Sequence, residues 1–148
     1  DLTGYRSELV LLATAGFIGT VGAALLQPLI AATGFDIASL PGWSVMLALV
    51  FIIPVTGQLG MNPILAVSLL APLLPSAAAL GLEPAALIVA ITAGWALSGI
   101  TSPYTATTLL VGSFGHVSAR RVGLVWNGIY VAVVTTALGL WVVTVALI

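Results

Sequence analysis

The residues best suited to chemistry in this chain are uncharged, and they gather in two short stretches that interrupt apolar sequence. The first reads TGQLGMNP over residues 56–63, and the second reads TSPYTATT over residues 101–108. Each stretch combines hydroxyl or amide side chains with a proline, which lacks a backbone N–H and interrupts helical hydrogen bonding. Both therefore predict a helix that stops and restarts, with polar groups at the interruption.

The composition places these stretches in a membrane protein. The chain has 148 residues, of which 61% are hydrophobic and 5% charged, whereas soluble domains are roughly 45–50% apolar and about 25% charged. Three arginines, no lysine and four acidic residues leave no basic surface, so nucleic-acid partners are not expected. With no cysteine and one histidine, neither thiolate chemistry, a metal site nor a buried cofactor is expected.

The elements that must position the two stretches follow from the apolar runs. A bilayer core needs about 20 apolar residues in a helix, and residues 8–33 and 122–148 predict two spanning helices. Between them, residues 43–80 and 84–112 each contain one polar stretch. The predicted fold is a single all-α membrane domain over 1–148, with spanning helices, a re-entrant helical hairpin and a broken transmembrane helix.

The hairpin is predicted because the polar stretch between runs 43–55 and 64–80 carries no charge, as an aqueous loop between two spans usually would. Non-helical backbone at membrane depth survives where protein buries it or where it lines a cavity. We therefore expect a re-entrant hairpin over 43–80 with its tip near 56–63. In the span 84–112, Pro103 predicts that the helix stops near residues 99–101 and restarts around Ala106.

The arginines give the expected orientation. Arg6, Arg120 and Arg121 fall on one side of this layout, and Asp36 and Glu83 fall on the other. By the positive-inside rule the arginine side is cytoplasmic, and the expected location is the bacterial inner membrane.

Discontinuous helices that meet near the membrane midplane are typical of secondary transporters, in which half-helix N-termini attract anions and freed carbonyls coordinate cations. Asn62 is placed like an N-cap of the second hairpin helix. Thr105, Thr107 and Thr108 supply hydroxyl groups where the broken helix restarts. The predicted substrate- and ion-binding residues are Thr56, Gly57, Gln58, Gly60, Asn62, Pro63, Thr101, Ser102, Pro103, Thr105 and Thr107.

A plainer interpretation stays open at this point. Pro103 can be a simple kink, with the threonines bonded back to carbonyls of their own helix. For Asn127, we expect an interhelical hydrogen bond. The small residues Gly16, Gly19 and Gly22 favour close helix packing within the subunit over a dimer seam.

The order of these elements resembles the C-terminal repeat of the ion transporter superfamily. The similarity is carried by LLAPLLPSAAALGLEPAALIVAI, by SGITSPYTATTLLVGSFG and by RRVGLVWNGIYVAVV. It is greatest to the divalent anion:sodium symporters for citrate and dicarboxylates, and the large permease subunit of TRAP transporters is a near alternative. The family's hairpin tip then falls on 60–63, its outer turn on Glu83 and Pro84, and its helix break on 102–105.

The chain departs from the family pattern at both motifs. GMNP stands where the family has Ser-Asn-Thr, and Tyr104 and Thr105 replace the second proline and the asparagine of its break. Those family residues help to hold sodium and the substrate carboxylate, so the resemblance leaves the coupling ion open between Na⁺ and H⁺.

The function that the resemblance implies is alternating-access transport of a small anion, a di- or tricarboxylate. It also implies an elevator-like movement, a homodimer and an N-terminal repeat of the same transporter as partner. The first residue is not methionine, which with the single repeat predicts about half of a larger transporter. The alternatives are a TRAP-type permease subunit, another exchanger or efflux permease of the superfamily, a channel-like pore, or a non-transporting scaffold subunit. An enzyme is not expected, because no carboxylate pair lies at membrane depth.

Overall fold

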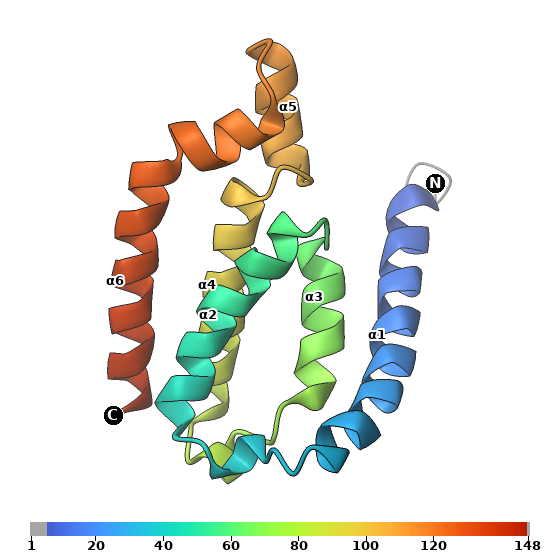
Figure 1. Ribbon diagram of the computed structural model, residues 1–148, viewed down its shortest axis with the longest axis vertical. Coiled ribbons are helices and arrows are strands. Elements are labelled where there is room, and N and C mark those ends of the chain that lie inside the picture. Colours follow the sequence, from blue (N-terminus) through green and yellow to red (C-terminus); the bar gives the residue numbers. More distant parts are fainter. Residues whose placement is uncertain (1–5, 148) are drawn as a thin grey trace.

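The computed structural model describes residues 6–147, and every regular element in that range is a helix (Figure 1). The elements in chain order are α1 (Arg6–Ala32), η2 (Ile37–Ser39), α2 (Gly42–Gln58), α3 (Pro63–Leu70), η3 (Ala71–Leu73), η4 (Ala78–Leu80), α4 (Pro84–Thr101), α5 (Ala106–Phe114), the π-helix η5 (Arg121–Trp126) and α6 (Gly128–Ala146).

Three helical stretches are long and apolar enough to cross a membrane: Leu9–Ala32, Pro84–Phe114 and Gly128–Ala146. The outer two expose most of their apolar side chains. Over an 18-residue apolar stretch of α1, 17% of the residues are buried, and over the corresponding stretch of α6 the buried share is 11%. Such faces suit contact with lipid. The all-α fold predicted from the sequence is thus confirmed for the described residues, and the three long apolar helices are compatible with the predicted membrane protein.

Helices α2 and α3 form an antiparallel pair joined by a tight turn. Helix α2 ends at Gln58, and Gly60 adopts a positive φ of 95° that a side chain would disfavour. Asn62 then caps α3 by accepting from Ile64 N–H at 2.8 Å, with Pro63 at the first helical position.

The apolar run 64–80 is helical over less of its length than its composition suggests. The helix ends in the 3-10 turn η3 at Leu73, because Pro72 and Pro75 cannot continue it. The chain then turns through η4 and Gly81, whose φ is 65°.

Helix α4 ends at Thr101 and α5 begins at Ala106, on either side of Pro103. After α5 the chain does not enter the last span directly. It passes through the π-helix η5, which leads to the start of α6 (Figure 1). The predicted span 122–148 is therefore two elements, divided at Asn127.

The core lies between α2 and α4, with α6 packed alongside. Its largest fully buried side chains include Met46, Val50, Ile53 and Leu97. The two helices approach closely at Gly94, where a Cβ would lie 2.6 Å from the carbonyl oxygen of Leu49. Glycine at this crossing permits the backbone contact that apolar packing in lipid relies on.

Helix α1 packs against α3 through its small residues. A Cβ at Gly19 would lie 2.5 Å from the carbonyl oxygen of Ser68, and one at Gly22 would meet the side chain of Leu69. A Cβ at Gly16 would meet nothing within 4 Å. The glycines of α1 at positions 19 and 22 thus pack within the chain, as expected.

The three arginines lie at one end of the molecule. The start of α1 and the α5–η5 connection lie at one end, and the α1–α2 and α3–α4 connections lie at the other (Figure 1). Arg6, Arg120 and Arg121 belong to the first group, and Asp36 and Glu83 to the second.

Candidate functional site

The two interruptions meet in the structure. Ser102 Oγ, at the end of α4, donates to the carbonyl oxygen of Gly57, in the last turn of α2, at 2.7 Å. A Cβ at Gly57 would collide with Ser98 Oγ and would lie 3.2 Å from Ser102 Cβ. One turn further along, a Cβ at Gly60 would lie 3.9 Å from the ring of Tyr104. The hairpin turn therefore rests against the break between α4 and α5.

The carbonyl groups that the break frees are satisfied from nearby. In an uninterrupted helix Gly99 O would pair with the amide of residue 103, but Pro103 has none. Thr105 Oγ1 occupies that position instead, 2.9 Å from Gly99 O and 3.0 Å from Ser102 O. Asn127 Nδ2 donates to Ile100 O at 2.9 Å, which is the interhelical bond expected for this residue.

Two more threonines complete this buried cluster. Thr108 Oγ1 donates to Ser102 O at 2.6 Å, and Thr101 Oγ1 donates to Leu97 O at 2.7 Å. The residues Thr101, Thr105 and Thr108 are each 8% exposed or less. They stabilise the broken backbone directly, as the plainer interpretation of this stretch requires.

The two restarting helices differ at their N-termini. Asn62 caps α3, whereas no side chain caps α5, because Thr105 Oγ1 turns back toward Gly99 and Ser102. Thr107 lies exposed in the first turn of α5. The first-turn amides of α5 thus carry the positive end of a helix dipole with no side-chain acceptor of their own.

The remaining tip residues lie in different surroundings. Thr56 Oγ1 donates back to Ile53 O at 2.8 Å. Asn62 is exposed, Pro63 is buried and Pro103 is partly buried. The side chain of Gln58 is partly buried, and no hydrogen bond is formed by its amide within residues 6–147.

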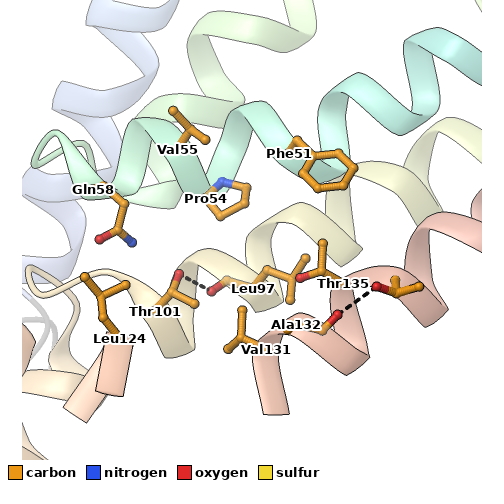
Figure 2. Close-up of a pocket in the computed structure, with 11 residues that line it drawn as sticks. Phe51, Pro54, Val55, Gln58, Leu97, Thr101, Leu124, Val131, Ala132 and Thr135 are labelled. Atoms are coloured by element: carbon orange, nitrogen blue, oxygen red, sulfur yellow. Dashed lines mark hydrogen bonds between the residues drawn. The ribbon is translucent and has the colours of Figure 1, made fainter. Parts of the chain in front are cut away.

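Gln58 and Thr101 line an open cavity of about 460 Å³ between α2, α4, η5 and α6. Figure 2 shows Gln58 pointing from α2 toward Thr101 and Leu124 across this cavity. The remaining wall is formed by Phe51, Pro54, Val55, Leu97, Val131, Ala132, Thr135 and Thr136. Of the predicted site residues, these two face a cavity that a small molecule could enter.

Sequence reasoning did not single out Ser98. Its side chain is fully buried, and among the described residues its Oγ has no hydrogen-bond partner. It lies one helical turn before Ser102 on the same face of α4, so the spacing of the two serines was the available signal. Buried polar atoms are almost always paired, which makes Ser98 an exception at the contact of the two interruptions.

The chain was compared with protein-family models, with curated proteins and with solved structures. None of them matches it.

Proposed function

We propose that this chain is the C-terminal repeat of a secondary active transporter that moves a small anion, a di- or tricarboxylate, by alternating access. The observation that carries the proposal is the meeting of the two interruptions, which puts Gly57 of the hairpin in contact with Ser102 of the break. Paired discontinuities of this kind form the binding sites of many secondary transporters.

The short second arm of the hairpin supports a re-entrant arrangement. Helix α3 has 8 residues, which at 1.5 Å per residue extend about 12 Å, less than half of the roughly 30 Å hydrocarbon core. If α2 enters the membrane from one face, α3 returns toward the same face, and the tip of the hairpin stays inside the membrane. Non-helical backbone there needs burial against protein, and the α4–α5 break supplies it.

The anion preference is argued from the N-terminus of α5. Its uncapped amides offer hydrogen bonds and a positive dipole end to a carboxylate, and no acidic residue lies between Asp36 and Glu83 or between Glu83 and the C-terminus to oppose it. The amide of Gln58 supplies a further hydrogen-bond donor, in the cavity that it lines with Thr101. The freed carbonyls supply acceptors for a coupling ion, Na⁺ or H⁺.

The proposed membrane placement follows from the charges. The end with Arg6, Arg120 and Arg121 is cytoplasmic by the positive-inside rule, and the end with Asp36 and Glu83 faces outward. As a repeat, the chain would build its site with an N-terminal repeat of the same transporter. We propose a homodimer in the bacterial inner membrane and an elevator-like movement, on the family resemblance.

Uptake of radiolabelled citrate and succinate into proteoliposomes that contain the full-length protein tests the proposal, with Na⁺ and pH gradients applied separately. Gln58→Ala should lower uptake about tenfold or more, since a hydrogen bond to a charged group contributes about 1.5–3 kcal/mol. Thr20→Val is the matched control, because Thr20 bonds to its own helix in α1 and should leave uptake unchanged. No saturable, gradient-dependent uptake of either anion would overturn the proposal.

A non-transporting scaffold subunit is a second candidate, favoured by one observation. The hydroxyl groups of Thr101, Thr105 and Thr108 are all engaged with backbone carbonyls, so the polar cluster already has a structural role. A scaffold predicts no saturable uptake by the wild-type protein, and a lower melting temperature when the Thr105 hydroxyl group is removed. A TRAP-type permease subunit instead predicts uptake that needs a soluble binding protein.

A further inference from the structure

An apolar cavity of about 260 Å³ lies at the end of the molecule opposite the arginines, away from the two interruptions. It is enclosed by the end of α1, η2, the first turns of α2 and the end of α3. Its walls include Ile30, Phe35, Leu49 and Leu74, with Ser44 as the one polar residue. A cavity of this lining takes a hydrocarbon chain more readily than water.

A second cavity of about 380 Å³ adjoins the first and has a different character. The second also includes Gln27 and Asp36, and the wall common to both is formed by Ile30, Phe35, Ile37, Leu73 and Leu74. Asp36 is the one charged residue that lines either cavity. Together they make an amphipathic site, apolar at one end and negatively charged at the other.

Hydrogen bonds fix the polar end in place. Gln27 Nε2 donates to Pro72 O at 3.2 Å, which ties α1 to η3 across the site. Asp36 Oδ1 accepts from Ala38 N–H at 2.9 Å, which orients the carboxylate at the start of η2, while the side chain remains exposed.

We propose that these two cavities bind one phospholipid whose head group carries a primary ammonium, with an acyl chain in the apolar cavity and the ammonium beside Asp36. The charge argument selects the head group. An ammonium gains attraction and hydrogen bonds from an exposed carboxylate, whereas the uncharged glycerol of phosphatidylglycerol supplies no cation to offset the repulsion between its phosphate and Asp36. The inference rests on the membrane setting and not on the transported anion.

Native mass spectrometry of the detergent-solubilised full-length protein tests this, with titration of phosphatidylethanolamine and phosphatidylglycerol of identical acyl chains. The wild-type protein should bind phosphatidylethanolamine more tightly. Asp36→Asn should lower that affinity roughly threefold to fivefold, the size of an exposed ion pair, and should not weaken phosphatidylglycerol binding. Because Asp36 is exposed, the variant should fold normally, and an unchanged melting temperature would show that it does.

Two further variants sharpen the test. Ala48→Trp places a large ring in the apolar cavity, which Ala48 lines, and should weaken both lipids. Glu83→Gln is the matched control, because Glu83 lies at the same end beside a different cavity and should change neither affinity. Equal binding of the two lipids by the wild type, or no effect of Asp36→Asn, would overturn the proposal. A dimer that forms in place of lipid binding would also overturn it and assign the cavity to a second copy.

Discussion

Ser98 and Ser102 lie one turn apart at the end of α4, and both face the last turn of α2. Their hydroxyl groups differ in hydrogen bonding and therefore in their contribution to stability. Ser102 Oγ donates to Gly57 O and accepts from Tyr104 N–H at 3.2 Å. Within residues 6–147, Ser98 Oγ is buried and has no hydrogen-bond partner. A buried hydroxyl without a partner contributes a desolvation cost and no compensating bond.

This difference predicts opposite outcomes for two alanine variants. Ser102→Ala should lower the free energy of unfolding by about 1–2 kcal/mol, since two hydrogen bonds of about 1 kcal/mol each are lost. Ser98→Ala should leave it unchanged or raise it slightly. Denaturant unfolding of the solubilised variants measures both. A larger loss for Ser98→Ala than for Ser102→Ala would show that the Ser98 hydroxyl has a partner, such as water or an ion.

Substitution of Gly57 distinguishes the effect of close packing from that of local helix propensity. A Cβ there would collide with Ser98 Oγ, so Gly57→Ala should destabilise the protein by about 1–3 kcal/mol, the usual cost of overpacking. Gly99→Ala is the matched control in the facing helix, because a Cβ there meets nothing within 4 Å. The melting temperatures of the two variants compare them directly. Equal melting temperatures would contradict the close approach of α2 and α4.

The contact between α1 and α3 depends on which glycine faces it. Gly19→Ala should push α1 away from Ser68 and speed hydrogen exchange in α3, whereas Gly16→Ala should have little effect because its surroundings are open. Hydrogen–deuterium exchange with mass spectrometry reads out both variants. Faster exchange in the Gly16 variant would instead indicate that this face of α1 packs against another chain.

Several element boundaries could be predicted because they depend on local chemistry. Pro103 removes an amide, so α4 stops at Thr101, and Asn62 followed by Pro63 is a typical start for α3. The short length of α3 was harder to predict from the sequence, since residues 64–80 are almost uniformly apolar. The π-helix η5 had no local signal, because nothing in RVGLVW distinguishes it from an α-helix.

The candidate site could be predicted as two polar interruptions but not as a set of contacts. The pairing of Gly57 with Ser102, of Gln58 with the cavity, and of Asn127 with Ile100 O depends on how α2, α4 and α6 pack in space. Apolar sequence constrains that packing weakly, because most residues can face either lipid or a neighbouring helix. Ser98 was missed for this reason, and Thr107 was included although it lies exposed.

The arrangement of the whole molecule predicts the accessibility of single cysteines, since the chain has none of its own. Ser118→Cys, in the α5–η5 connection, should react with a membrane-impermeant maleimide from the cytoplasmic side. Ser39→Cys and Ala79→Cys, in the connections at the other end, should react from outside. All three positions are exposed, so each labelling rate reports sidedness. Labelling of Ser118→Cys and Ser39→Cys from the same side would contradict the proposed placement.

The π-helix before α6 sets the rotational phase of the last helix. Each residue of an α-helix advances the chain by about 100° around its axis, and π-helical turns arise where a helix holds an extra residue. Deleting one residue within Arg121–Trp126 would therefore turn α6 by roughly that angle. Gly139, which faces Leu47, and Val142, which is fully buried, would then point toward lipid. The fit of α6 onto α2 depends on a residue count in a segment that α6 does not include.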